Sequence, residues 1–140
     1  MFCPKCAGEA FIRALQEVVR DKAHLSFKVN LSDLFWVQSS DNSEYRTYTN
    51  KIDRKHVDIL LCHPKTLKPI LGIELDDNSH QRQDRQERDA FVDEVFESAG
   101  LSLLHIPVRR GYQFDELATL LMPYLEENPV PIIQPVVFPT

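Results

Sequence analysis

Residues 56–80 decide the fold: they read His-Val-Asp-Ile-Leu-Leu-Cys-His, then Pro-Lys-Thr-Leu-Lys, then Pro-Ile-Leu-Gly-Ile-Glu-Leu-Asp-Asp-Asn-Ser-His. Two apolar runs flank a short turn rich in Pro, Lys and Thr, a pattern that predicts a β-hairpin. A loop symmetric about Thr66 would place Asp58 directly opposite Glu74 on the neighbouring strand. Because alternate residues of a strand share a face, Asp76 joins these two carboxylates on one side of the hairpin.

These three acidic side chains predict a functional site. Directly opposed residues of an antiparallel pair have Cβ atoms about 5 Å apart. Carboxylates at that spacing repel each other, and burying them in a sheet of Val, Ile and Leu is costly unless protons or a cation compensate. Oxygen ligands at such a spacing suit a divalent metal ion.

Length and composition indicate an ordinary globular domain. The chain has 140 residues, enough to bury a sizeable core in one domain. Its formal net charge of −5 argues against binding nucleic acid by bulk charge, although a local basic surface beside an acidic metal pocket is compatible with it. No apolar run approaches the roughly 20 residues of a membrane helix and no basic-then-apolar leader opens the chain, so we expect a cytoplasmic protein with no membrane partner.

The cysteines allow one further metal hypothesis. Cys3 and Cys6 form a Cys-Pro-Lys-Cys knuckle, which supplies only half of a tetrahedral zinc site. Zinc is therefore expected only if Cys3 and Cys6 belong to a larger ribbon, of which residues 1–7 would be a remnant. Cys62 falls inside a predicted strand and is expected to be a buried small apolar residue.

Hydrophobic periodicity and capping residues predict the elements before the hairpin. Apolar residues at three- and four-residue steps indicate a helix over residues 8–22, and loose alternation indicates a strand over 24–31. Ser32-Asp33 is expected to cap a short helical turn through 34–36. The polar residues 38–50 are expected to form a loop.

A long helix is predicted after the hairpin, over residues 81–99, with Gly100 placed to end it. Such a crossover allows the apolar run 101–107 to form a strand parallel to the one that contains Glu74. With a last helix over 114–125, the order α-β-β-β-α-β-α predicts an α/β (α+β) protein whose mixed central sheet is flanked by helices. This domain would span residues 8–127, followed by a Pro-rich extended tail over 128–140.

Four pieces of the sequence resemble the "domain of unknown function" family 2726. They are Val-Asp-Ile-Leu-Leu at 57–61, Ile-Glu-Leu-Asp-Asp-Asn-Ser-His at 73–80, Arg-Asp-Ala-Phe-Val-Asp at 88–93 and Ala-Gly-Leu-Ser-Leu-Leu-His-Ile at 99–106. That family looks like a branch of the restriction-endonuclease-like nucleases, close to the very-short-patch-repair endonucleases and phage homing endonucleases. The resemblance extends from about Gly8 to Leu121 and implies a restriction-endonuclease-like fold.

The resemblance also implies roles for individual residues. Residues matching Asp58 and Glu74 bind Mg²⁺ (or Mn²⁺), and a His matching His80 assists proton transfer. Glu9 matches an early helix Glu that would orient His80 or complete an outer shell. The alternatives without a functional role are that Glu9 complements the helix dipole and that His80 is an ordinary loop residue. Asp76 stands where the common signature has a Lys, so either His80 takes over the task of that Lys or catalysis has been lost. Asp76 itself is either a second metal ligand or a partner of His80.

Basic residues near these positions are candidates for nucleic-acid contacts. Lys51, Arg54 and Lys55 come just before the strand that contains Asp58; they form either a solvated edge or a patch that contacts phosphates. Asp89 is expected to pair with Arg85 or Arg88 rather than to touch a metal. The further candidates for nucleic-acid binding are Arg82, Arg85, Arg109 and Arg110.

Three functions compete on this sequence. A divalent-metal-dependent nuclease that hydrolyses phosphodiester bonds in DNA is favoured. A catalytically degenerate nuclease fold that serves as a nucleic-acid- or protein-binding module is the alternative. An interaction module built on the cysteine knuckle is the third, and the oligomeric state stays open.

Overall fold

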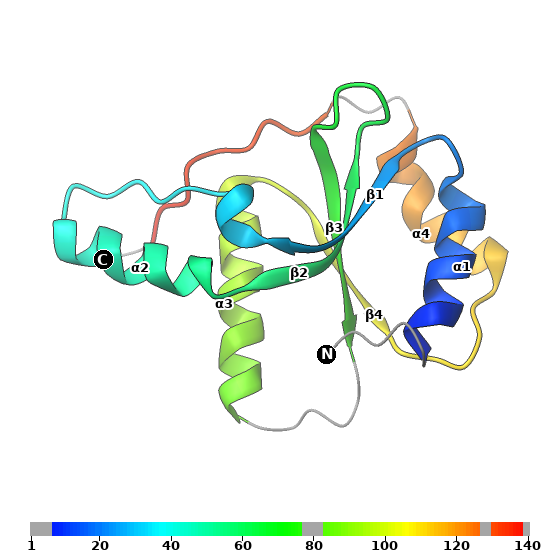
Figure 1. Ribbon diagram of the computed structural model, residues 1–140, viewed down its shortest axis with the longest axis horizontal. Coiled ribbons are helices and arrows are strands. Elements are labelled where there is room, and N and C mark those ends of the chain that lie inside the picture. The colour runs from blue at the N-terminus through cyan, green and yellow to red at the C-terminus, as the bar shows by residue number, and fades with distance from the viewer. Residues whose placement is uncertain (1–6, 77–82, 127–129, 139–140) are drawn as a thin grey trace.

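The computed structural model of the chain describes residues 7–76, 83–126 and 130–138. A four-stranded mixed sheet, in the order β1-β2-β3-β4, lies between helices (Figure 1). The mixed α and β class and the order α-β-β-β-α-β-α are therefore confirmed, with two further helices after the first strand. The elements are α1 (Ala7–Val19), β1 (His24–Asn30), the 3-10 helix η1 (Leu31–Asp33), α2 (Asn42–Asp53), β2 (His56–Cys62), β3 (Pro69–Asp76), α3 (Gln83–Ala99), β4 (Leu103–Pro107) and α4 (Phe114–Leu125).

The hairpin of β2 and β3 has the register that the sequence predicts. Its antiparallel strands pair Ile59 with Ile73 and Leu61 with Leu71, which is the symmetry about Thr66. The His63 ring closes the turn, because its Nδ1 atom accepts hydrogen bonds from the backbone N–H groups of Lys65 and Thr66 at 3.1 and 3.2 Å. Local turn geometry thus sets which residues of the two strands face each other.

Each face of the sheet is covered by its own helices. On one face, Ile59, Leu61, Leu71 and Ile73 are fully buried against α1 and α4, which lie side by side in Figure 1. On the other face, α3 packs over residues of the opposite parity such as Leu60. Because side chains alternate along a strand, Asp58 and Glu74 point to the α3 side. The α3 residues buried in this second cluster are Val92, Val95, Phe96 and Ala99.

Close packing of α3 on the sheet depends on Gly72. A Cβ atom at this position would lie only 2.7 Å from Cε2 of Phe96 and 3.1 Å from Cδ1 of Leu103. Those distances are shorter than van der Waals contact, so a residue with a side chain could not occupy this point of β3 without displacing the Phe96 ring of α3. Gly72 therefore sets the distance between α3 and the part of β3 that leads to Glu74.

The parallel strand β4 brings a second set of polar residues to this end of the sheet. Its register pairs Glu74 with His105 and Asp76 with Pro107. Gly100 ends α3 with a φ of 79°, the left-handed conformation predicted for this position. The start of β2 and the ends of β3 and β4 consequently lie at the same end of the sheet. Polar side chains from all three strands gather there.

Two predictions between β1 and β2 were wrong. Residues 42–53 form α2 instead of continuing the loop predicted over 38–50, and the Asp41 carboxylate caps the helix by accepting the N–H groups of Ser43 and Glu44 at 2.9 and 3.2 Å. The short helix also begins earlier than predicted. It is η1 over Leu31–Asp33, capped by Asn30, and not a turn through 34–36 capped by Ser32-Asp33. In both cases the helix begins after an Asn or Asp cap that the sequence reading missed.

The C-terminal segment runs extended along the molecule and completes the core beside α2. Val136 forms a parallel bridge with Val37, and both Val136 and Phe138 are buried. The Phe138 ring stacks on Tyr48 of α2, with ring centroids 3.8 Å apart. No helix in the described part of the chain is long and apolar enough to cross a membrane.

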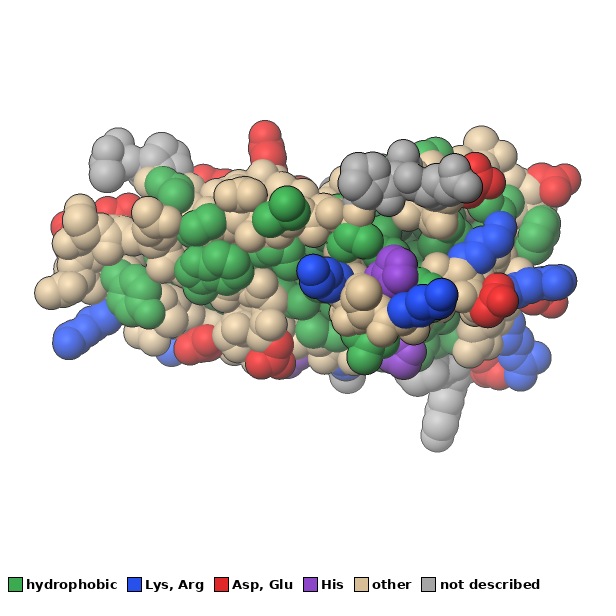
Figure 2. Space-filling view, turned by 90° about the horizontal axis from the view of Figure 1, so that it is seen from above, with side chains coloured by type: hydrophobic (Ala, Val, Ile, Leu, Met, Phe, Trp, Pro, Cys, Tyr) green, Lys and Arg blue, Asp and Glu red, His purple; other side chains and the backbone are tan. Residues whose placement is uncertain are grey.

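The opposite end of the sheet, at the hairpin turn, has exposed basic side chains. Figure 2 views the molecule from that end and shows Lys, Arg and His side chains gathered near the middle of the face. Lys65 and Lys68 of the turn are exposed. They lie at the far end of β2 and β3 from Asp58 and Glu74, so they belong to another surface.

Candidate active site

Asp58 of β2 and Glu74 of β3 form the centre of the candidate site. The register that pairs Ile59 with Ile73 continues by one step to set Asp58 opposite Glu74. Oδ2 of Asp58 accepts a hydrogen bond from the Leu75 N–H at 2.9 Å, which directs this carboxylate toward β3. Both acidic side chains are half-buried. The geometry predicted for the pair is confirmed, and its role as a metal site stays a prediction.

The electrostatics of this pair are unusual. Burial, the negative charge of Asp58 and a hydrogen bond with the Asp58 side chain raise the pKa of Glu74 from 4.5 to about 9. The charge of Asp89, on α3, acts in the same direction. At neutral pH the pair therefore retains a proton unless a cation offsets the second negative charge.

The raised pKa of Glu74 predicts how the stability of the protein depends on pH. Between pH 4.5 and about 9 the unfolded chain loses the Glu74 proton that the folded chain keeps. Because the folded state then binds more protons, the free energy of unfolding is expected to fall as the pH rises through this window. Urea denaturation at pH 5, 7 and 9, without divalent ions, measures the effect.

The matched variant for this experiment is Asp58→Asn, which removes the charge beside Glu74 and keeps an acceptor for the Leu75 N–H. Its unfolding free energy should fall less steeply with pH, since the Coulombic cause of the shift is gone. A parent protein that becomes more stable from pH 5 to pH 9 would contradict the assignment.

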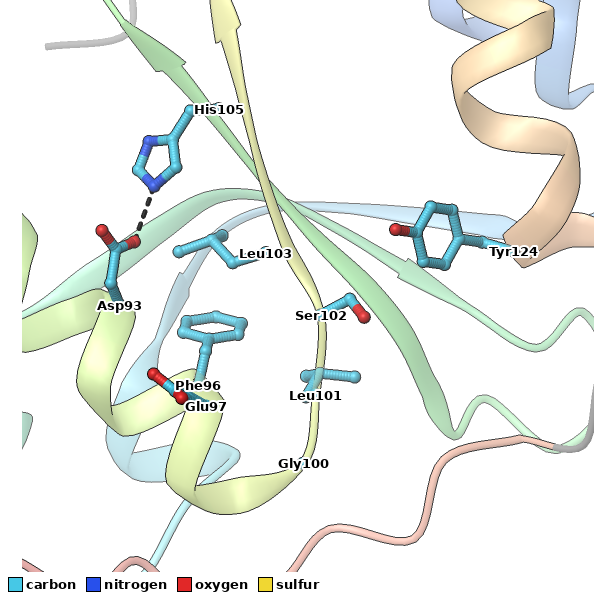
Figure 3. A pocket seen from close by; sticks show the side chains of 9 residues that line it. All are labelled: Asp93, Phe96, Glu97, Gly100, Leu101, Ser102, Leu103, His105 and Tyr124. Atoms are coloured by element: carbon cyan, nitrogen blue, oxygen red, sulfur yellow. Dashed lines mark hydrogen bonds and ion pairs between the residues drawn. The ribbon is translucent and has the colours of Figure 1, made fainter.

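A second cluster lies next to the pair and joins β3, β4 and α3. Nδ1 of His105 is 3.0 Å from Oδ2 of Asp76, and Nε2 of His105 is 2.6 Å from Oδ1 of Asp93 (Figure 3). Burial disfavours the charged imidazole, but the hydrogen bonds and charges of Asp93 and Asp76 outweigh it and raise the pKa of His105 above 6.5. The stabilisation from this charge is present below pH 6.5 and is lost as the pH rises through the folded-state pKa, so it adds to the slope described for Glu74.

The sequence reading missed His105 and Asp93 as site residues. The available signal was the one that identified Asp58: a single ionisable residue in an otherwise apolar strand, here Leu-Leu-His-Ile-Pro at 103–107. Asp89 was expected to pair with Arg85 or Arg88, whose side chains lie outside the described residues. That pairing stays a prediction. The charge of Asp89 acts on Glu74, which depends on the placement of α3 over the sheet.

A cavity of about 590 Å³ adjoins the second cluster, running along β4 between α3 and α4. Figure 3 shows His105 and Asp93 at one end of this cavity and Tyr124 of α4 across from them. Within residues 7–76, 83–126 and 130–138, no three His, Cys, Asp or Glu side chains are grouped so as to hold a metal ion. A metal ion at Asp58 and Glu74 therefore stays a prediction.

Glu9 is on α1, and its expected role toward His80 stays a prediction. It stands in the first turn of α1, the helix that covers the other face of the sheet. Its Oε1 atom is 2.6 Å from Nη2 of Arg13, one helical turn along, and both side chains are exposed. The structure thus brings Asp58, Glu74 and Asp76 to one face and leaves Glu9 paired on α1.

Two predicted basic residues lie against aromatic rings beside α3. The Nζ atoms of Lys51 and Lys55 are 5.3 and 4.9 Å from the ring centroid of Phe91. Lys55 also donates a hydrogen bond to the Lys51 carbonyl at 3.0 Å. Arg54, between them, is exposed at the end of α2. These side chains form a basic edge directly before the strand that contains Asp58.

The other predicted basic residues follow β4. Arg109 and Arg110 are exposed in the loop after Pro107, and Nη1 of Arg109 is 3.1 Å from Oε1 of Glu116. Basic side chains therefore precede β2 and follow β4 along the chain. The predicted site residues His80 and Arg82, the side chain of Arg85, and Cys3 and Cys6 lie outside the described residues, so their roles stay predictions.

Comparison with known proteins identifies a family for this chain. A family model described as "Protein of unknown function (DUF2726)" matches residues 7–123. No curated protein and no solved structure matches the chain. The matched region spans every helix and strand from α1 to most of α4, and it includes all three acidic residues of the hairpin.

Proposed function

The chain belongs to the family of unknown function DUF2726, and we propose that it is a divalent-metal-dependent nuclease that hydrolyses phosphodiester bonds in DNA. The observation that supports this most is the direct opposition of Asp58 and Glu74, with the pKa of Glu74 raised to about 9. Two carboxylates in such a setting are a costly arrangement for a scaffold, and a strongly perturbed carboxyl group is a marker of functional sites.

The donor set fits magnesium. Mg²⁺ usually keeps several water ligands and is bound through one or two carboxylates together with substrate phosphates. Asp58 and Glu74 offer two hard oxygen donors from neighbouring strands, and the charge of a cation between them would replace the proton that Glu74 otherwise retains. The pair does not resemble a closed zinc site, which needs four protein ligands.

The remaining chemistry follows from the chain's own residues. A cation held there would neutralise charge on the scissile phosphate and lower the pKa of an attacking water. Asp58 keeps one oxygen on the Leu75 N–H, so its orientation is fixed before anything binds. The basic edge of Lys51, Arg54 and Lys55 would contact the DNA backbone and direct a phosphate toward Asp58 and Glu74.

A restriction-endonuclease-like arrangement is part of this proposal. Two features are compatible with that fold. One is the antiparallel hairpin followed by a helical crossover to a parallel strand, and the other is the placement of carboxylates at the start of β2 and the end of β3. We expect the activity in the cytoplasm.

Incubation of the purified protein with supercoiled plasmid DNA tests the proposal. Nicked or linear product should appear with Mg²⁺ or Mn²⁺ and should not appear with EDTA. Titration of Mn²⁺ into the protein alone, followed by electron paramagnetic resonance, should show one binding site per chain that competes with Mg²⁺.

The alternative function predicts a different pair of results. A degenerate nuclease fold that only binds nucleic acid would retard DNA in a gel but leave it uncut with either ion. Absence of both cleavage and Mn²⁺ binding would refute the metal-dependent nuclease.

A further inference from the structure

We propose that His105 is a positioning residue of this site: it holds the Asp76 carboxylate beside Glu74 and connects that carboxylate to α3 through Asp93. The inference rests on the proposed function, because it assigns His105 a role in organising the same cation site. It adds a partner for Asp76 that the sequence did not indicate, since the geometry pairs Asp76 with His105.

The first support is the contact between His105 and Asp76. Nδ1 of His105 lies 3.2 Å from Oδ1 and 3.0 Å from Oδ2 of Asp76, so both carboxylate oxygens face the imidazole ring. Asp76 is the last residue of β3, and its side chain is half-exposed. A carboxylate at such a strand end would otherwise exchange among rotamers, and the imidazole selects one of them.

The second support is that the ring itself is held. Its other nitrogen, Nε2, is 2.6 Å from Oδ1 of Asp93, a short distance for a charge-assisted hydrogen bond. A ring with a carboxylate at each nitrogen cannot rotate without breaking one of the two contacts. Figure 3 shows the ring directed from β4 toward Asp93 of α3. His105 therefore joins the end of β3 to α3 through two hydrogen bonds.

The third support is the position of this bridge relative to the acidic pair. His105 is the register partner of Glu74 on β4, and Asp76 lies two residues beyond Glu74 on the same face of β3. Asp93 lies one helical turn after Asp89, whose charge acts on Glu74. A fixed Asp76 can order the water ligands of a cation held by Asp58 and Glu74, which is the usual role of carboxylates outside the ligand shell.

Two conservative variants distinguish this role from a purely structural one. The side-chain amide of His105→Asn reaches the place of Nδ1 and can still donate to Asp76, whereas that of His105→Gln reaches the place of Nε2 and can donate only to Asp93. Both variants lose one of the two hydrogen bonds and the imidazole charge. A merely structural bridge would be weakened alike by the two changes.

The test is Mn²⁺ titration of the full chain followed by electron paramagnetic resonance, with thermal unfolding of the metal-free proteins as the measure of structural damage. His105→Gln is expected to weaken Mn²⁺ binding by roughly tenfold or more, the usual effect of losing a residue that orients the ligand shell. His105→Asn should keep most of the affinity, and the two variants should unfold at similar temperatures. His24→Gln is the matched control, since His24 is exposed at the other end of the sheet. This variant should bind Mn²⁺ as tightly as the parent protein does.

A background variant completes the experiment. In Asp76→Ala, the added change His105→Gln should cause no further loss of Mn²⁺ affinity, because the residue through which His105 acts is absent. Equal loss in His105→Asn and His105→Gln, or unchanged or tighter binding in both, would overturn the role of His105 and leave the nuclease proposal intact. A parent protein that binds no Mn²⁺ would overturn the nuclease proposal itself, and this inference with it.

Discussion

Replacing Asp58 by asparagine is expected to abolish Mg²⁺-dependent cleavage while the protein stays folded. The cation that Asp58 and Glu74 are proposed to hold would contribute several kcal/mol of transition-state stabilisation, and each ~1.4 kcal/mol is tenfold in rate. The loss should therefore be about a thousandfold or more. Cleavage of supercoiled plasmid with a saturating amount of enzyme measures it.

The stability of the same variant should change in the opposite direction. Asparagine keeps an oxygen that can accept the Leu75 N–H, and it removes the negative charge that helps to raise the pKa of Glu74 to about 9. Without metal and at pH 7, the free energy of unfolding should match or exceed that of the parent. A catalytic group held under repulsion is expected to behave in this way, whereas a structural group is not.

The control for this prediction is Asp53→Asn, the same chemical change at the exposed end of α2. It should leave both the rate and the stability unchanged. Equal cleavage by Asp58→Asn and the parent would remove the metal-site assignment, whatever the stability result.

The second large effect is expected from Phe96→Ala. Phe96 is 1% exposed, its ring meets that of Phe35 edge-to-face at 4.9 Å between centroids, and it lies over Gly72 of β3. Truncating a buried Phe to Ala costs about 3–5 kcal/mol, because the lost contacts leave a cavity. Gly72, which lies against the ring, has no side chain that could fill it.

Urea denaturation at pH 7 measures this loss, and Phe114→Ala is the comparison. Phe114, at the start of α4, is 46% exposed, so its truncation should change the free energy of unfolding by no more than about 0.5 kcal/mol. If Phe96→Ala cost as little as the control, the close contact between α3 and Gly72 could not be what holds α3 on the sheet.

The hairpin and its pairing could be predicted because they are local. Period-two alternation tells which side chains share a face, and a short loop leaves little freedom in register, so Asp58 opposite Glu74 follows from counting outward from Thr66. The helix over 114–125 could be predicted for the same reason, since its apolar residues recur within one segment.

Helix α2 could not be predicted from periodicity, because its sequence is polar and rich in residues that favour turns. Its packing comes from distant parts of the chain. Tyr48 stacks on Phe138 of the C-terminal segment and on Phe91 of α3, with ring centroids 3.8 and 6.4 Å apart. Such contacts decide whether a weak helix former is helical, and a local pattern does not contain them.

The sequence by itself therefore determined the class of the fold, the hairpin register and the meeting of Asp58 with Glu74, because all three depend on neighbours along the chain. Only the tertiary structure decided which other groups surround that pair. His105 reaches Asp76 through the parallel register of β4, and Asp93 reaches His105 because Gly72 lets α3 approach the sheet. These partners are 12 to 29 residues apart along the chain, so their contacts exist only once the helical crossover has closed and α3 has packed.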